Sequence, residues 1–154
     1  GQLPYLTVDG SLKVPQSLAI ARFLARRFNL AGQNEIEQVQ SDAVVDTLND
    51  MQNGYYQKVF MAKEDEVVRR FLAEDAVNHL NKIEKIISLY GSNGHAVGSS
   101  LTWADLFLWD ITGLVVNLDP HILEKYQHIP AVRKTVESNP RIAEYLKNRQ
   151  PTPF

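Results

Sequence analysis

The sequence of 154 residues contains no cysteine, which excludes both a disulfide framework and a thiolate nucleophile. It has no apolar run long enough for a membrane span or a secretory signal core. Its formal net charge is only −2, so the basic footprint of a nucleic-acid-binding protein is missing. The four histidines do not have a metal-ligand spacing. These absences favour a cytoplasmic protein with one well-packed core and with no nucleic-acid or membrane partner.

The residues at the start of the chain predict an anion-binding and backbone-binding site. Leu3-Pro4 precedes alternating apolar residues, and a cis X-Pro bond costs only about 0.5–1 kcal/mol. Gln16-Ser17 opens a helix, where free N–H groups and the positive end of the helix dipole favour a carboxylate. Serine is also a preferred helix N-cap, so an ordinary capping role for Ser17 is the alternative.

Hydrophobic periodicity predicts a mainly helical protein. Asp9-Gly10 is typical of a hairpin turn, and the short link at 62–64 predicts that the helices before and after it are antiparallel neighbours. Three arginines of the first helix lie outside its apolar face, and their side chains are expected to be solvated. They are Arg22, Arg26 and Arg27. The expected elements are strands at 5–8 and 12–14, and helices at about 17–28, 35–58, 65–90, 102–118, 129–139 and 140–148.

Two polar patterns lie on the predicted helices. The first is an acidic stripe on one face of the long helix, which is either a solvated face or a contact for a ligand or partner. The second begins the helix at 102, where Thr102 and Asp105 have the spacing of a capping box and Leu101 and Leu106 that of a hydrophobic staple. That pattern concerns folding, and we expect no catalytic role for Asp105. The stripe consists of Asp42, Asp46, Asn49, Asp50 and Asn53.

Several ordered motifs together resemble one family. The run Gln-Leu-Pro-x-Leu-x-Val-Asp-Gly begins at Gln2, and Gln-Ser-Leu-Ala-Ile-Ala-Arg begins at Gln16. With Asp-Thr-Leu-Asn-Asp from Asp46 and Leu-Thr-Trp-Ala-Asp from Leu101, they cover essentially the whole chain. The sequence resembles a cytosolic glutathione transferase, closest to the sigma class and its nematode relatives. The resemblance implies a remnant of the thioredoxin-like domain at 1–31, a β-hairpin plus a helix, followed by the all-α C-terminal domain at 32–154.

The resemblance also implies a site. Gln16 and Ser17 would bind the γ-glutamyl carboxylate of glutathione, Leu3 would pair its backbone with the cysteinyl unit, and Gln2 would approach from the side. Pro4 would be cis. Glutathione would act as co-substrate, without a further cofactor.

Positions on the long helix and at the C-terminus complete the implied site. Asp50 would reach across a dimer to the glutathione of the partner subunit. Asn49 stands where some relatives have a carboxylate that binds a divalent cation, and we therefore expect no metal. The electrophile pocket would be lined by Tyr55, Tyr56 and Phe154, although ordinary packing explains each of them equally well.

In the family, the β-α-β unit that carries the sulfur-activating tyrosine precedes the position of Gly1. A truncated chain, a processed product and a shortened paralogue are all compatible with this beginning. The expected function is conjugation of glutathione to apolar electrophiles in detoxification, with little activity of this chain by itself. A non-enzymatic ligand-binding or scaffolding protein is the alternative, and a crystallin-like structural role is the third. Intact relatives would be homodimers, whereas this chain would be a monomer or weak dimer.

Overall fold

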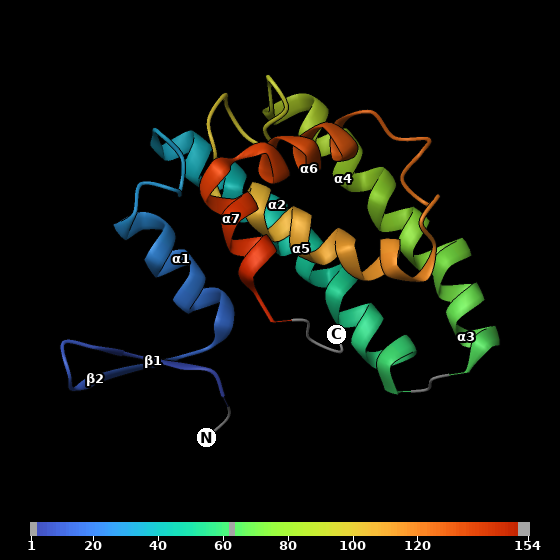
Figure 1. Cartoon of the computed structure of the whole chain (residues 1–154), viewed down its shortest axis with the longest axis horizontal. Helices are drawn as coiled ribbons and strands as arrows, with labels where there is room; N and C mark the ends of the chain where they lie inside the picture. The colour runs from blue at the N-terminus through green and yellow to red at the C-terminus, as the bar shows by residue number, and fades with distance from the viewer. Residues whose placement is uncertain (1–2, 62–63, 151–154) are drawn as a thin grey trace.

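The computed structural model describes residues 3–61 and 64–150 and is mainly helical (Figure 1). A two-stranded antiparallel hairpin comes first, with β1 at Tyr5–Val8 and β2 at Leu12–Pro15. The predicted turn is present: Asp9 and Gly10 have φ values of 51° and 77°. Both lie in the left-handed region, which glycine enters without steric cost. The N–H of Ser11 donates to the carbonyl of Val8 at 3.2 Å and closes this turn, so three residues, 9–11, connect Val8 to its strand partner Leu12.

The helices follow the predicted periodicity, with one class of deviation. The long segment predicted at 65–90 is interrupted by a π-helical turn, and the helix predicted to run to about 58 is α-helical only to Tyr55 before a second π-helical turn. The two turns are bridged by Lys58, whose Nζ donates to both carboxylate oxygens of Asp75 at 2.8 Å. The helical segments are α1 (Ser17–Arg27), α2 (Glu35–Tyr55), η1 (Tyr56–Phe60), α3 (Asp65–Arg70), η2 (Phe71–Ala76), α4 (Val77–Tyr90), α5 (Trp103–Leu118), α6 (His128–Ser138) and α7 (Pro140–Asn148).

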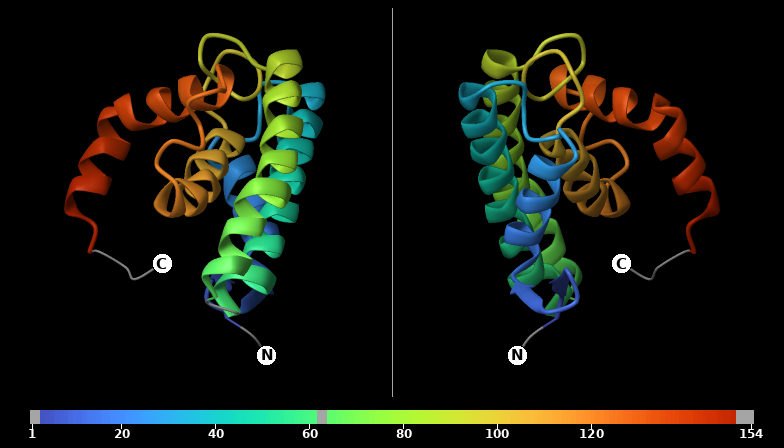
Figure 2. Two further views of the ribbon diagram at one scale, coloured as in Figure 1. Left: turned by 90° about the vertical axis from the view of Figure 1, so that its right-hand side faces the viewer. Right: turned by 90° about the vertical axis from the view of Figure 1, so that its left-hand side faces the viewer.

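The core lies between α2, α4, α5 and α6. Figure 2 shows α2 and α4 side by side, with α6 and α7 on the opposite side of α5. Leu48, Leu80, Leu108 and Ile129 come from these four helices, and each is fully buried. The same core includes Ala25 of α1, so α1 rests on the helical bundle, and the hairpin packs against α1. In the described ranges 3–61 and 64–150, no helix has both the length and the apolar character needed to cross a bilayer.

A side chain of α4 fixes the start of α6. The carboxylate of Glu84 accepts hydrogen bonds from the backbone N–H groups of Gln127 and His128, both at 2.8 Å, and of Ile129 at 3.0 Å. These are N–H groups at the start of a helix, which have no partner within the helix itself. Glu84 therefore ties α6 to α4 across more than 40 residues of sequence.

Candidate functional site

The sequence-predicted residues at the start of the chain meet in one cavity of about 300 Å³, lined by Leu3, Pro4, Pro15, Gln16 and Ser17. The strand register explains this meeting. Tyr5 stands opposite Pro15, so the residues just before β1 and just after β2 reach the same end of the hairpin. The Leu3-Pro4 peptide bond is cis, as the resemblance implied.

The backbone turns sharply where β2 passes into α1. Gln16 has φ 76° and ψ 111°, a left-handed conformation that a residue with a side chain rarely adopts. Its carbonyl accepts the first helical hydrogen bond, from the N–H of Ile20 at 2.9 Å. Gln16 is thus the N-cap and Ser17 the first residue of α1, so the alternative of Ser17 as the N-cap is not what the structure shows.

The start of α1 can receive an anion. The first N–H groups of a helix have no partner within it, and the helix dipole makes this end positive. The first turn of α1 contains no acidic residue that would compete with an incoming carboxylate. Gln16 and Ser17 are both exposed. The cavity can therefore bind a carboxylate at the start of α1 and an extended backbone along Leu3.

The other proposed ligand contacts lie elsewhere. Tyr55 is half-buried, with its ring centroid 6.1 Å from that of Phe71, and burial raises the pKa of its hydroxyl. Tyr56 packs edge-on against Phe60 at 5.7 Å. These rings form a cluster around η1 and do not line the cavity at the hairpin. Two further predicted residues, Gln2 and Phe154, lie outside the described part of the chain.

The acidic stripe on α2 is partly neutralised from within the chain. Arg22 of α1 donates from Nε to Asp42 at 2.9 Å and from Nη2 to Asp46 at 3.3 Å. Its guanidinium also lies 5.2 Å from the ring centroid of Trp103 on α5. The expectation of a solvated Arg22 is therefore wrong, because the face of α1 beside the core also faces α2. Asp50 lies one turn beyond Asp46 and is exposed.

The capping box on α5 is present and deeply buried. The Asp105 carboxylate accepts from the N–H and the hydroxyl of Thr102, at 2.7 and 2.8 Å. It also accepts from the N–H of Ala96 at 2.7 Å, which holds the loop between α4 and α5 against the helix. Burial raises the pKa of Asp105, whose side chain is fully enclosed. The Ala96 contact carries no short-range sequence signal, and sequence reasoning missed it.

Comparisons with known proteins agree with this arrangement. Residues 46–149 match the family described as the glutathione S-transferase C-terminal domain. The chain belongs to the glutathione S-transferase family. This glutathione S-transferase is 36% identical over 155 residues to human hematopoietic prostaglandin D synthase. The alignment covers 99% of this chain and 75% of that protein.

Nematode glutathione S-transferases are similarly close. Glutathione S-transferase 3 of Caenorhabditis elegans is 34% identical over 160 residues, covering 100% of this chain and 77% of the relative. Among solved structures, the Pi-class glutathione S-transferase of Onchocerca volvulus superposes with a TM-score of 0.86 at 32% identity, over 96% of this chain and 71% of that one. The family resemblance inferred from the motifs is thus confirmed, and so is the helical glutathione S-transferase fold.

Proposed function

We propose that this chain binds glutathione in the cavity at the hairpin, as part of a transferase that conjugates the glutathione thiol to apolar electrophiles. The observation that carries the proposal is the meeting of Leu3, Gln16 and Ser17 at the start of α1. A tripeptide with a free carboxylate matches both features of the cavity, namely an anion-binding helix start and an exposed backbone edge. Membership of the glutathione S-transferase family supports the same ligand.

We assign each of these residues to one part of glutathione. The hydroxyl of Ser17 and the N–H groups of the first turn of α1 hold the γ-glutamyl carboxylate, with Gln16 beside them. The backbone of Leu3 pairs with the cysteinyl unit, and Gln2, which lies outside the described residues, is assigned to the same ligand. In a dimer, Asp50 binds the γ-glutamyl ammonium of the glutathione held by the partner subunit. For the electrophile pocket we propose Tyr55 and Tyr56, together with Phe154, which lies outside the described residues. Glutathione is the co-substrate, no further cofactor or metal takes part, and the protein works in the cytoplasm in detoxification.

The second candidate function is a non-enzymatic ligand-binding or scaffolding role. The residues that we assign would hold the peptide part of glutathione, and we assign none of them to the sulfur. The two candidates share the binding site and differ in the chemistry at the thiol, since the thiolate is the reactive species.

Ser17→Ala and Gln16→Ala are each expected to weaken glutathione binding by about 1–3 kcal/mol, the usual cost of an unmade polar contact. Calorimetric titration measures this loss. Ser11→Ala is the matched control, because Ser11 is an exposed serine of the same hairpin that does not line the cavity. Unchanged affinity in both variants would remove them from the site. A large drop in the melting temperature of Ser17→Ala would instead indicate a folding role.

We further expect the chain by itself to be monomeric or only weakly dimeric. Stable interfaces usually bury more than about 1,000 Å², and the outer face of α2 offers Ile36 and Val39 beside the exposed carboxylates of Asp46 and Asp50. Arg22 forms ion pairs with Asp42 and Asp46 within the chain. The repulsion between the acidic faces of two copies is therefore weaker than it would be if Asp42, Asp46 and Asp50 were all unpaired. Sedimentation over a wide concentration range tests the prediction. A dimer that persists on dilution, and that Asp50→Lys weakens, would contradict it.

A further inference from the structure

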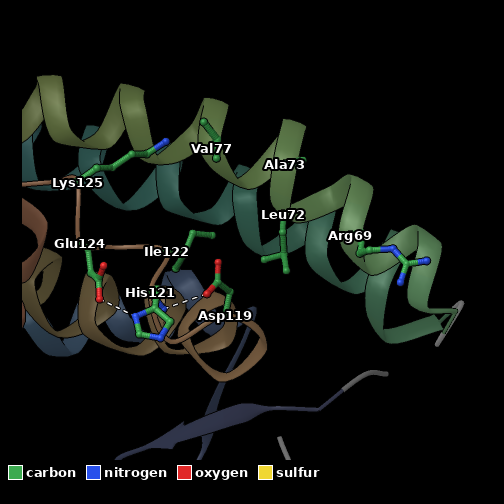
Figure 3. Close-up of a pocket in the computed structure, with 9 residues that line it drawn as sticks. All are labelled: Arg69, Leu72, Ala73, Val77, Asp119, His121, Ile122, Glu124 and Lys125. Atoms are coloured by element: carbon green, nitrogen blue, oxygen red, sulfur yellow. Dashed lines mark hydrogen bonds and ion pairs between the residues drawn. The ribbon is translucent and has the colours of Figure 1, made fainter.

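The connections between helices are held in different ways. From α5 to α6, the connection is braced by its own side chains: Asp119 accepts from the N–H of His121 at 3.0 Å, and Glu124 bonds Nδ1 of His121 at 2.6 Å (Figure 3). From α4 to α5, the connection at 91–102 is held on either side of its tip. The N–H of Ser92 donates to the carbonyl of Gly98 at 2.8 Å, and the N–H of Ala96 is bonded to the buried carboxylate described above. The tip lies between these two bonds.

This tip is a tight turn at Ser92–His95, which the N–H of His95 closes by donating to the carbonyl of Ser92 at 2.9 Å. Its central residues, Asn93 and Gly94, have φ values of 53° and 77°, as in the mirror-image turns that asparagine and glycine favour. In the described ranges, neither the N–H of Gly94 nor the side chain of Asn93 makes a hydrogen bond. The exposed amide of Asn93 thus stands beside a free backbone nitrogen.

These two groups are the reactants of a slow intramolecular reaction. The Gly94 nitrogen attacks Cγ of Asn93, the Cγ–Nδ2 bond breaks, and Nδ2 leaves as ammonia with the proton of the Gly94 N–H. The nitrogen is then shared by Cγ and the backbone carbonyl carbon in a succinimide ring. Water opens this ring at either bond: cleavage at Cγ gives aspartate, and cleavage at the backbone carbon gives isoaspartate. Glycine favours the attack because it has no Cβ to shield its nitrogen.

The chain contains a second Asn-Gly pair, Asn53-Gly54, in a different setting. Asn53 is exposed as well, but both residues lie inside α2. An N–H in the body of an α-helix is bonded to the carbonyl four residues before it, and the helix holds its backbone in one conformation. Attack at Asn53 therefore requires the end of α2 to open first, whereas at Asn93 no hydrogen bond of the Gly94 N–H has to break.

The turn packs closely against α6. A Cβ atom at Gly94 would lie only 2.5 Å from Oγ1 of Thr135 and 3.4 Å from the carbonyl oxygen of Ala131. Isoaspartate lengthens the backbone before Gly94 by one methylene group, because the chain then runs through Cβ and Cγ. The longer chain has no room toward α6, so Gly94 must move away from it. Close-packed contacts are lost when such a shift occurs.

We propose that Asn93 is a site of spontaneous deamidation, and that its isoaspartate product detaches the turn at 92–95 from α6. The modification adds a negative charge and consumes only water. It lowers the stability of the folded chain with age. Neither Asn93 nor Gly94 lines the cavity at the hairpin, so the site is separate from the glutathione site proposed above.

The test incubates the 154-residue chain at mildly alkaline pH. Digestion with pepsin in acid, followed by mass spectrometry, locates each new acid, and labelling by isoaspartyl methyltransferase distinguishes isoaspartate from aspartate. Conversion at Asn93 is expected to be at least about tenfold faster than at Asn53, because a helical amide reacts only through local opening. In guanidinium chloride the two rates are expected to become similar, since unfolding removes the protection by α2.

Asn93→Gly is the matched control, because glycine accepts the left-handed turn and has no amide to lose. After equal incubation, the unfolding midpoint is expected to fall in the wild type and to stay constant in Asn93→Gly. Equal conversion at Asn93 and Asn53 in the folded chain would overturn the site. Formation of isoaspartate at Asn93 with an unchanged midpoint would overturn the effect on the contact with α6.

Discussion

Replacement of Asp105 by alanine is expected to lower the free energy of unfolding by about 3–5 kcal/mol, because three donors in a fully buried place would lose their acceptor at once. An ordinary helix cap contributes about 0.5–2 kcal/mol. The difference arises from the Ala96 N–H, which belongs to the preceding loop and bonds the carboxylate at 2.7 Å. Urea unfolding followed by circular dichroism measures the loss.

Asp110→Ala is the matched control for the lost hydrogen bonds, since it removes a solvent-accessible carboxylate from the same helix, although partial burial also raises the pKa of Asp110. Burial raises the pKa of Asp105 in the folded protein above its unfolded value. The stability contributed by this protonation is thus fully present below the unfolded pKa and is lost as the pH rises through the folded pKa. We therefore expect Asp105→Ala to lower the free energy of unfolding at least as much in acid as at neutral pH. Wild-type unfolding midpoints in Asp105→Ala would show that the three hydrogen bonds are dispensable.

Joining a family-type β-α-β unit to the N-terminus is expected to raise the rate of glutathione conjugation by about 100-fold or more. Positioned acid–base groups raise reaction rates by about 10²–10⁴-fold, and the residues proposed above would hold the peptide part of glutathione rather than its sulfur. Turnover of an aromatic electrophile at saturating glutathione measures the gain. The control is the same fusion with phenylalanine in place of the tyrosine in the added unit.

The glutathione affinity of the chain itself, measured separately, distinguishes failure of binding from failure of chemistry. If the 154-residue chain turns over the electrophile as fast as the fusion, the assignment of its residues to binding alone is wrong. Tight glutathione binding with no turnover even in the fusion would favour the ligand-binding or scaffolding role.

Short-range patterns predicted much of this fold. Asp9-Gly10 specified the hairpin, and Thr102 with Asp105 specified the start of α5, because turns and caps depend on neighbours within four residues. Apolar periodicity located the helices. It did not reveal the π-helical turns, because one extra residue per turn barely disturbs an apolar pattern of this length.

Contacts between residues that are far apart in the sequence could not be predicted from these short-range patterns. Periodicity shows which face of a helix is buried but not which helix covers it. Arg22 therefore looked like a solvated charge, although its partners Asp42 and Asp46 lie 20 and 24 residues away. Likewise, nothing near Glu84 in sequence indicates that it holds the start of α6. In the candidate site, the motif named four of the five residues that line the cavity, Leu3, Pro4, Gln16 and Ser17, whereas the left-handed backbone of Gln16 became visible only in the structure.

Helix α1 carries Ser17 at its first position and Arg22 five residues later, where the guanidinium meets α2. The same helix therefore joins the proposed glutathione site to the face of α2 that carries Asp42 and Asp46. Thermodynamic linkage makes such a connection reciprocal: an occupant of the cavity that shifts α1 changes the affinity of whatever binds that face of α2, and the second event changes the first by the same factor. The Arg22 ion pairs to Asp42 and Asp46 are the contacts through which such a shift of α1 would reach α2.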